Sequence, residues 1–493
     1  MAIGEKDQPN LLLIMTDQFR ADLLKQYGGD FVKTPRLDQL SEEGVTFERA
    51  YSQTPVCIPA RHGLISGKHP FEVGLMENKR ERKEINNPLP RLIRDAGYFT
   101  CAVGKMHFIP TREHFGFDRM FLSEGIPSHI QDDDYLQYLR RNGYGELFEP
   151  YGERSEKYYV PQVSPLPEEH HVTTWTTDKS IETICRNSNR NFFLFSSFNN
   201  PHPPFDPVEP YDGLYPLADV PLPTRKESEL KPDDRLIEIQ NDYKVGGIEN
   251  ISERRIKKIR SYYYGSVTQL DKHIGRLLDF LKSEELRRNT LIVFTADHGE
   301  LLGDHYAFGK RTFYEESTRI PLILSWPGHL PEGQKSEAFV LLQDIYATLL
   351  SRTGSKLPSD CRGKDLVELI EEGTEKARGE IFGEYGSGKN IKFMVRWQNY
   401  KYIYHSNGQR ENLYHLEKDP RELEDIAEDN PELCKKCRSK LVERYKNYSF
   451  DKVLDGGGNE LIKFDYEAPE KGGFLDQSPD WPDTIIDDCP EVN

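Results

Sequence analysis

Residues 10–15, with the sequence NLLLIM, are followed directly by Thr16-Asp17-Gln18, and this stretch decides the fold. A continuous apolar run of this length is typical of a strand that is buried on both faces. Further runs of this kind follow along the chain, at residues 99–103, 191–198, 290–295 and 321–326. The sequence therefore predicts a buried sheet, with Asp17 at the carboxyl end of its first strand.

Helical patterns separate the predicted strands. Residues 35–43, closed by Gly44, and residues 252–285 are the clearest of them. The alternation of strands and helices predicts an α/β sandwich around a large, mostly parallel sheet. In such sheets, binding and catalytic sites gather beyond the carboxyl ends of the strands.

The character of the sequence changes near residue 375. We predict a main domain over residues 1–375 and a smaller C-terminal α+β domain over residues 376–450. Within the smaller domain, residues 392–405 read as hairpin strands, and residues 410–430 as a strand followed by an acidic helix.

Residues 451–493 are predicted to form an irregular acidic tail that packs on the body. Isolated aromatic residues support packing, because they are scarce in disordered tails. They are Phe464, Tyr466, Phe474 and Trp481. Disorder is the alternative.

The charge of the chain excludes several classes of partner. The 493 residues carry a formal net charge of −17, which repels nucleic acids and anionic membrane surfaces. No stretch approaches the roughly 18–20 apolar residues that a membrane span needs. Neither nucleic acid nor a membrane is therefore expected as a partner. A small anionic substrate requires positive side chains that converge locally.

The N-terminal segment and the cysteines indicate a cytoplasmic protein. Glu5 and Asp7 stand where a secretory signal carries positive charge, and the apolar run at residues 11–15 is too short for its core. The seven cysteines are scattered and odd in number, which is untypical of a disulfide framework. Cys434-Lys435-Lys436-Cys437 has C-x-x-C spacing without a second pair at zinc-site spacing, so coincidence is the preferred interpretation.

The stretch Cys57-Ile58-Pro59-Ala60-Arg61 carries the most specific chemistry. Its C-x-P-x-R spacing resembles the core motif of the type I sulfatases, which have the alkaline phosphatase superfamily fold. The resemblance implies that a formylglycine-generating maturation enzyme oxidises Cys57 and that the hydrated aldehyde is the nucleophile. The plain alternative for a lone cysteine is a small buried hydrophobe.

Asp297 follows the predicted strand 290–295, as Asp17 follows the first strand. The two residues are 280 positions apart in sequence, but the carboxyl ends of parallel strands lie at one edge of a sheet. Either residue alone could instead be the N-cap of a helix. The resemblance implies a divalent metal, and its implied ligands are Asp17, Gln18, Asp297, His298 and the formylglycine at Cys57.

Gln18 and His298 depart from the commonest sulfatase pattern, which has Asp and Asn at these positions. The change removes one negative charge and replaces one oxygen ligand by nitrogen. Calcium stays the first expectation, and manganese, magnesium and zinc become admissible. A similar Asp-Gln and Asp-His pairing occurs in choline sulfatases and phosphonate monoester hydrolases.

Three further segments supply positive charge and proton carriers. Gly104-Lys105-Met106-His107 resembles the second signature of the family, and Lys105 and His107 point the same way if the preceding strand continues. His202 lies in a proline-rich loop that limits its movement. Lys310 stands where related enzymes carry a sulfate-contacting lysine. Solvated lysines, a core histidine and a turn histidine are the plain alternatives.

The implied reaction is hydrolysis of a sulfate monoester, in which the hydrated formylglycine attacks sulfur in line. The metal, Lys105 and Lys310 would neutralise the sulfate oxygens. His202 would protonate the departing alcohol, with Lys310 as its rival. His107 would then take a proton from the second hydroxyl, so that the covalent sulfate leaves and the aldehyde is regenerated. Arg61 would hold the formylglycine and the metal ligands, because a planar guanidinium binds several oxygens at once.

Four residues are candidates for contact with the rest of the substrate, namely His62, Asn78, His305 and Arg311. His62 either lines the pocket or packs beneath it, and Asn78 either lines the pocket or serves turn geometry. So many donors favour a sulfated sugar or another small organic sulfate. A phosphonate monoesterase or phosphodiesterase on the same site is the first alternative. A non-catalytic binder of sulfated ligands is the second.

Overall fold

A computed structural model describes residues 8–125, 127, 129–147, 149–152, 161–230, 251–373 and 376–469. Within these ranges the main sheet has eight strands, in the order β4-β3-β5-β1-β6-β7-β2-β8. The strands are β1 (Asn10–Thr16), β2 (Val45–Tyr51), β3 (Phe99–Gly104), β4 (Arg119–Leu122), β5 (Phe192–Phe198), β6 (Thr290–Ala296), β7 (Leu322–Ser325) and β8 (Gln334–Leu341). β1 pairs in parallel with β5 and β6, whereas β7 runs antiparallel to β6 and β2. The predicted mostly parallel sheet is confirmed.

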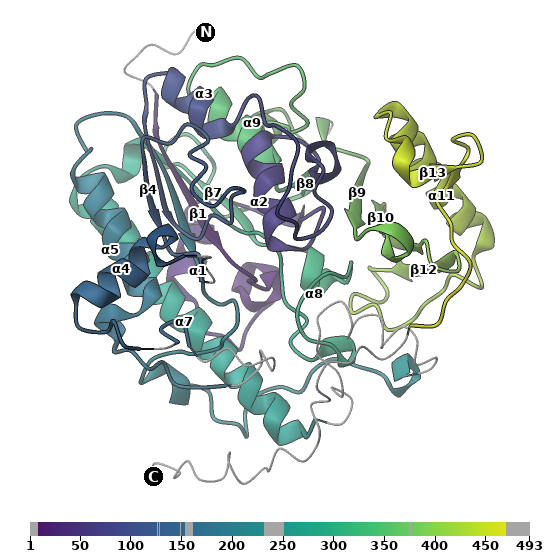
Figure 1. The fold of residues 1–493 in the computed structure, drawn as a ribbon, viewed down its shortest axis with the longest axis horizontal. Coiled ribbons are helices and arrows are strands. Elements are labelled where there is room, and N and C mark those ends of the chain that lie inside the picture. Colours follow the sequence, from purple (N-terminus) through teal and green to yellow (C-terminus); the bar gives the residue numbers. More distant parts are fainter. Residues whose placement is uncertain are drawn as a thin grey trace.

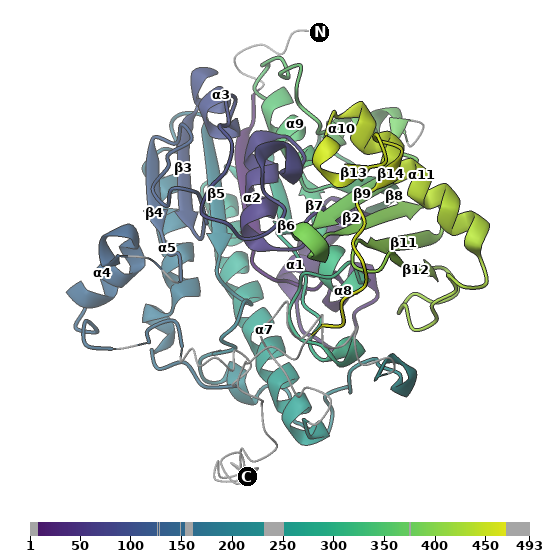
Figure 2. The same ribbon diagram turned by 45° about the vertical axis from the view of Figure 1, so that its right-hand side comes forward.

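Helices cover the sheet on both faces (Figure 1, Figure 2). On one side α7 contacts α1 and α5, and on the other α9 contacts α2 and α3. Every residue of β1, β5 and β6 is buried between these layers, which explains their long apolar runs. The helices are α1 (Pro35–Glu42), α2 (Cys57–Ser66), α3 (Leu89–Asp95), α4 (Asp134–Arg141), α5 (Val172–Cys185), α7 (Glu253–Ser283), α8 (Glu315–Thr318), α9 (Asp344–Ser351), α10 (Leu366–Glu372) and α11 (Pro431–Asn447).

The long helix α7 supports the loop that follows β1. The helix begins after Ser252, whose side chain accepts the amide hydrogen of Arg255 at 3.3 Å, as an N-cap does. Its buried Tyr263 donates its hydroxyl hydrogen to the backbone oxygen of Gln18 at 2.8 Å. Tyr263 of α7 therefore fixes the backbone of Gln18, in the segment that follows β1.

The C-terminal part of the described chain forms an antiparallel sheet in the order β12-β11-β10-β9. Its strands are β9 (Glu380–Tyr385), β10 (Lys392–Trp397), β11 (Tyr400–His405) and β12 (Arg410–His415). Tyr445 of α11 packs with Phe393 on one face, and Met394 packs with Val56 and Phe313 of the main unit on the other. The predicted smaller α+β domain is confirmed, and its limits at residues 376 and 450 stay a prediction.

The acidic helix predicted within residues 410–430 is wrong. After β12 the chain makes turns, and the next helix begins at Pro431. The acidic side chains bind backbone groups instead: Asp425 accepts the amide hydrogens of Leu413 at 3.0 Å and Ala427 at 3.1 Å. Glu422 is buried against Lys401 at 2.9 Å. Hydrogen bonds from side chains to the nearby backbone compete with the backbone hydrogen bonds of a helix, so this segment does not form the helix that its acidic composition suggested.

The described part of the tail packs on the C-terminal sheet. It forms the short strands β13 (Leu454–Asp455) and β14 (Glu460–Leu461), and Phe464 makes a β-bridge with Asn407. The segment 470–493, which includes Phe474 and Trp481, lies outside the described residues.

Cys434 and Cys437 are both buried in the apolar cluster beneath α11. Burial raises the pKa of Cys434 to about 11 and that of Cys437 to about 12. This supports the interpretation of the C-x-x-C spacing as a coincidence. Among the described helices, none combines the length and the apolar character that crossing a membrane requires.

Candidate active site

The pairing of β1 with β6 brings Asp17 and Asp297 together. The amide hydrogen of Gln18 is donated to Asp297 Oδ1 at 3.1 Å, directly across the two strand ends. Asp17, Cys57, Asp297 and His298 each offer one possible ligand atom, and these atoms lie within 4.8 Å of one another. All four side chains are buried. The sheet thus assembles residues that are 280 positions apart into one cluster.

Cys57 is the first residue of α2, and this helix delivers it to the cluster. Its sulfur lies 3.2 Å from His298 Nε2 and 3.7 Å from Asp17 Oδ1, with the residue only 2% exposed. Burial and the charge of Asp17 raise the pKa of the thiol, but Lys310, Lys105 and His298 outweigh them, so that it lies below its ordinary value. In this Cys57 differs from the buried Cys101, Cys434 and Cys437, whose pKa values are raised by burial.

In both Asp17 and Asp297, one carboxylate oxygen is paired with basic side chains and the other faces His298. The Oδ2 atom of Asp17 pairs with Lys105 at 2.7 Å and with Arg61 at 3.2 Å, and the Oδ2 atom of Asp297 pairs with Arg61 at 2.9 Å. Their Oδ1 atoms lie 3.8 Å and 3.5 Å from His298 Nε2. Two carboxylate oxygens and an imidazole nitrogen that converge in a buried place fit a divalent cation.

The charges around Asp17 keep its carboxylate ionised. Burial raises the pKa of Asp17, but Lys105, His202, Arg61 and His298 together hold it well below its ordinary value. The contribution of His202 also shows that this half-buried residue lies near the cluster. Its Nδ1 atom is 2.7 Å from the backbone oxygen of Pro203, within the proline-rich loop.

Gln18 lies between Lys310 and a residue that the sequence analysis missed. Its side-chain oxygen accepts a hydrogen bond from Lys310 Nζ, and its amide nitrogen donates to Glu300. Glu300 also accepts the amide hydrogens of Leu302 at 2.8 Å and Gly309 at 2.5 Å. It therefore ties the Lys310 loop to the end of β6. Only its place directly after Asp297-His298-Gly299 could have pointed to it.

The condition under which Lys105 and His107 would point the same way is not met, because the strand ends before Lys105. β3 ends at Gly104, whose φ of +97° suits glycine, and a Cβ atom there would lie 1.8 Å from the backbone oxygen of Ser197. His107 also has positive φ, at +51°. The structure still brings Lys105 to Asp17. Burial, and then the charges of Lys105 and Arg61, hold the pKa of His107 well below its ordinary value.

Two of the four substrate candidates lie next to the start of α2. Asn78 accepts the amide hydrogen of Ile58 at 3.2 Å, and the amide hydrogen of Arg311 is donated to the backbone oxygen of Pro55 at 3.1 Å. Both residues thus flank the segment that carries Cys57.

The other two candidates make their contacts with residues outside the cluster. His62 is buried with its ring edge-on to Phe108 and Phe115, and its Nδ1 atom lies 2.9 Å from the backbone oxygen of Ile58. This favours packing beneath the pocket over lining it. The buried His305 lies 2.6 Å from Glu229 and 3.6 Å from Glu316. The geometry therefore indicates a structural role for both histidines.

The ion pairs of His305 predict a loss of stability at alkaline pH. Burial lowers its pKa, but Glu229 and Glu316 more than offset this and raise it to about 9. The unfolded value is about 6.5, so the stabilisation is complete below about pH 6.5 and is lost as the pH rises through about 9. The shift corresponds to roughly 3 kcal/mol.

We expect His305→Gln to remove this part of the pH dependence of the free energy of unfolding, measured by urea denaturation at pH 6 and pH 9. His329→Gln is the control, because His329 is exposed. Equal pH dependence in the wild type and in His305→Gln would contradict the prediction.

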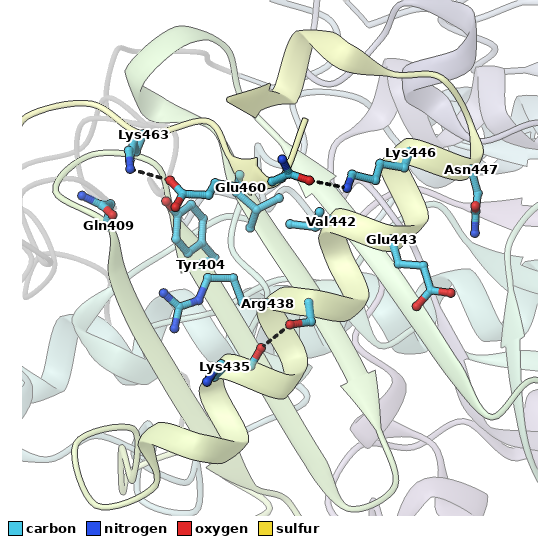
Figure 3. Close-up of a pocket in the computed structure, with 13 residues that line it drawn as sticks. Tyr404, Gln409, Lys435, Arg438, Val442, Glu443, Lys446, Asn447, Glu460 and Lys463 are labelled. Carbon is cyan, nitrogen blue, oxygen red and sulfur yellow. Dashed lines mark hydrogen bonds and ion pairs between the residues drawn. The ribbon is translucent and has the colours of Figure 1, made fainter. Parts of the chain in front are cut away.

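A separate hollow of about 560 Å³ lies on the C-terminal unit, between α11 and β14 (Figure 3). Lys463 is paired there with Glu460 at 2.5 Å, and Lys446 with Asn459 at 2.9 Å. The hollow borders the α11 side of the sheet, whereas Val56, next to Cys57, packs on the opposite face. It shares no residue with the candidate active site.

Comparison with known proteins agrees with this site. The chain matches the Sulfatase family over residues 9–355 and the family "N-sulphoglucosamine sulphohydrolase, C-terminal" over residues 303–448. An arylsulfatase of Clostridium perfringens is 32% identical over 482 residues, which cover 92% of this chain and 98% of that protein. An N-acetylglucosamine-6-O-sulfatase of Bacteroides thetaiotaomicron is 28% identical over 86% of this chain and 83% of its own.

Among solved structures, the phosphonate monoester hydrolase of Agrobacterium radiobacter has a TM-score of 0.77 at 26% identity. The alignment covers 90% of this chain and 96% of that one. The family match spans most of the chain, and it includes every residue of the buried cluster. The chain belongs to the sulfatase family, a family of sulfuric ester hydrolases.

Proposed function

We propose that this sulfatase hydrolyses the sulfate monoester of a sulfated sugar, or of another small organic alcohol, with Cys57 matured to formylglycine beside a divalent cation. The observation that carries the proposal is the position of Cys57, 3.2 Å from His298 Nε2 within a buried cluster of metal-ligand type. When present, formylglycine and the cation supply a hydrated-aldehyde nucleophile and electrostatic activation. A maturation enzyme is then a required partner.

Asp17, Asp297 and His298 are the side chains that would hold the cation. Gln18 is a further candidate, although its side-chain oxygen already accepts a hydrogen bond from Lys310. Calcium is our first choice, because carboxylate oxygens suit a hard cation. The imidazole of His298 keeps manganese, magnesium and zinc as alternatives.

Lys105 and Lys310 are proposed to bind the sulfate oxygens. Both side chains are buried next to the cluster, where a positive charge acts strongly on an anion. Because the chain has a net charge of −17, a site for an anion needs positive side chains that lie close together, and these two lysines supply them. Arg61 is already bound to both Asp17 and Asp297, so we assign it to positioning these carboxylates.

His202 and His107 are proposed to move protons. The low pKa of His107 keeps its ring neutral at physiological pH, which suits a proton acceptor. His202 lies on the half-buried loop near Asp17 and would protonate the departing alcohol, with Lys310 as its rival. Asn78 and Arg311, which flank the start of α2, are proposed to contact the rest of the substrate.

A phosphonate monoesterase or phosphodiesterase activity is the second candidate. The structural similarity to the phosphonate monoester hydrolase of Agrobacterium radiobacter supports it, together with the Gln18 and His298 pairing. A sulfated sugar is favoured by the similarity to the N-acetylglucosamine-6-O-sulfatase of Bacteroides thetaiotaomicron. A non-catalytic binder of sulfated ligands and the cytoplasmic location both stay predictions.

Mass spectrometry of the tryptic peptide 50–61, AYSQTPVCIPAR, tests the maturation of Cys57 in protein from its native host. We expect the mass of the aldehyde there, and an unmodified thiol in the peptide that holds Cys361. Burial raises the pKa of Cys361 to about 11, which makes it a matched inert cysteine.

The same preparation should turn over p-nitrophenyl sulfate and sulfated disaccharides with a kcat/KM at least about tenfold above that for a phosphodiester, a difference of about 1.4 kcal/mol. The reverse order of kcat/KM would support the phosphodiesterase. A thiol at Cys57, with binding of sulfated disaccharide and no turnover, would support the non-catalytic binder.

A further inference from the structure

Glu124 lies in the turn after β4, directly beside the segment that carries His107. The parallel pairing of β3 and β4 sets Gly104 opposite Leu122, so the two strands end side by side. The Glu124 carboxylate then accepts the amide hydrogen of Met106 at 3.2 Å on one oxygen and that of His107 at 2.9 Å on the other. Glu124 is only 3% exposed, so water does not compete for these bonds.

His107 needs such an anchor because its backbone conformation is unfavourable. Its φ is +51°, and a left-handed conformation costs about 1–2 kcal/mol in a residue with a Cβ atom. Burial raises the pKa of Glu124 to about 7, although the two amide hydrogen bonds act to lower it. Above about pH 7 these amides therefore bind an ionised carboxylate, and such bonds are stronger than bonds to neutral acceptors. The carboxylate of Glu124 can therefore hold two consecutive amides in a turn that the chain alone would avoid.

The anchored turn leaves both ring nitrogens of His107 without a hydrogen bond to Glu124. Within the described residues, Nδ1 is buried and has no hydrogen-bond partner. Nε2 lies 4.0 Å from the nearer Glu124 oxygen, which is too far for a hydrogen bond. A buried polar atom without a partner is uncommon and is often explained by a catalytic role. Glu124 can thus act on this ring only through the backbone of the His107 turn.

Glu124 is also connected to the loop of the second histidine. Its neighbour Ser123 donates its hydroxyl hydrogen to Asn199 Oδ1 at 2.8 Å, and Asn199 Nδ2 donates to the backbone oxygen of Ser123 at 2.9 Å. The backbone oxygen of Asn199 in turn accepts the amide hydrogen of His202 at 3.1 Å. The two-residue segment Ser123-Glu124 therefore contacts both histidine loops.

We propose that Glu124 is a positioning residue for the hydrolysis: it fixes the His107 turn and, through Ser123 and Asn199, the place of His107 relative to His202. The inference rests on the proposed function, in which these two histidines move protons. Glu124 itself is not one of the four residues of the buried cluster, which include the proposed nucleophile Cys57.

Glu124→Gln is the sharpest test, because the amide keeps the size of the side chain but offers only one oxygen to the two amide hydrogens. We expect kcat to fall about 10- to 100-fold, the effect of losing a group that orients a functional residue, with KM changed less than about twofold. Independent of activity, hydrogen exchange at Met106 and His107 should become at least about tenfold faster, which corresponds to 1.4 kcal/mol. The formylglycine content at Cys57 and the bound metal should not change.

Asp118→Asn is the matched control. Asp118 accepts the amide and hydroxyl hydrogens of Thr100, at 2.9 Å and 3.2 Å, near the other end of the same strand pair. It should lower the melting temperature without changing kcat. If Glu124→Gln does not fold, Glu124→Asp, which keeps the charge but retracts the carboxylate, should show a smaller loss of kcat with the same faster exchange.

If the wild type is active and Glu124→Gln keeps the wild-type kcat, the positioning role is wrong and the proposed function is unaffected. Equal losses of kcat in Glu124→Gln and Asp118→Asn would also overturn it, because the effect would then follow stability. A wild type that is matured at Cys57 but turns over no sulfate ester would overturn the proposed function, and the positioning role with it.

Discussion

Cys57→Ala is expected to lower kcat for a sulfate ester by at least about 10⁴-fold, the size of loss that removal of a catalytic nucleophile produces. In the function proposed above, Cys57 is the side chain of the buried cluster that becomes the hydrated aldehyde, and the neighbouring carboxylates are already paired with Arg61 and Lys105. No remaining side chain of the cluster can replace it as nucleophile. Steady-state turnover of p-nitrophenyl sulfate measures the effect.

Cys361→Ala is the control for this experiment, because Cys361 is half-buried and absent from the cluster. It should keep wild-type kcat. Binding of a sulfated disaccharide to Cys57→Ala, measured by calorimetry, should persist, since Lys105 and Lys310 are unchanged. Undiminished multiple turnover in Cys57→Ala would contradict the assignment of the nucleophile.

Asp297→Asn is expected to remove most of the bound metal and to lower kcat/KM by more than about 100-fold. Changes to groups that only orient metal ligands cost 10- to 100-fold, and the loss of a charged ligand should exceed them. The substitution keeps the shape of the side chain but removes its charge, both next to Arg61 and next to His298. Elemental analysis of the purified protein gives the metal content.

Asp304→Asn separates metal binding from general stability. Asp304 is also a buried carboxylate, paired with Arg20 at 2.8 Å and Arg260 at 3.3 Å, but it does not belong to the cluster. It should cost about 3–5 kcal/mol of stability, as a broken buried ion pair does, and leave the metal content unchanged. Equal metal loss in both variants would refute the assignment of Asp297 as a ligand.

The fold was predictable because its evidence is local. Long apolar runs such as residues 10–15 report strands that are buried on both faces, and these strands form the centre of the sheet. The acidic segment before residue 430 was predicted wrongly for the converse reason. Its composition suits a helix, but Asp425 binds the backbone of β12 and Glu422 binds Lys401, and a local pattern contains neither contact.

The candidate site divides in the same way. Cys57, Asp17 and Asp297 could be named in advance, because their chemistry and their places at a motif or a strand end are visible in the sequence. Glu124 could not, since an isolated glutamate carries no pattern, and Glu300 had no signal beyond its place directly after Asp297-His298-Gly299. The roles of both depend on which amide hydrogens the folded chain presents to them. Buried ionisable groups take their function from partners distant in sequence.

The sequence by itself therefore determined the α/β class, the strand ends that carry the two aspartates and the identity of the candidate nucleophile. Only the tertiary structure decided that His62 and His305 contact residues outside the cluster, that Gln18 lies between Lys310 and Glu300, and that Glu124 binds the amide of His107. The physical reason is that residue type and periodicity are properties of neighbouring positions. The partner of a buried polar group is chosen by strand register and helix packing across the whole fold.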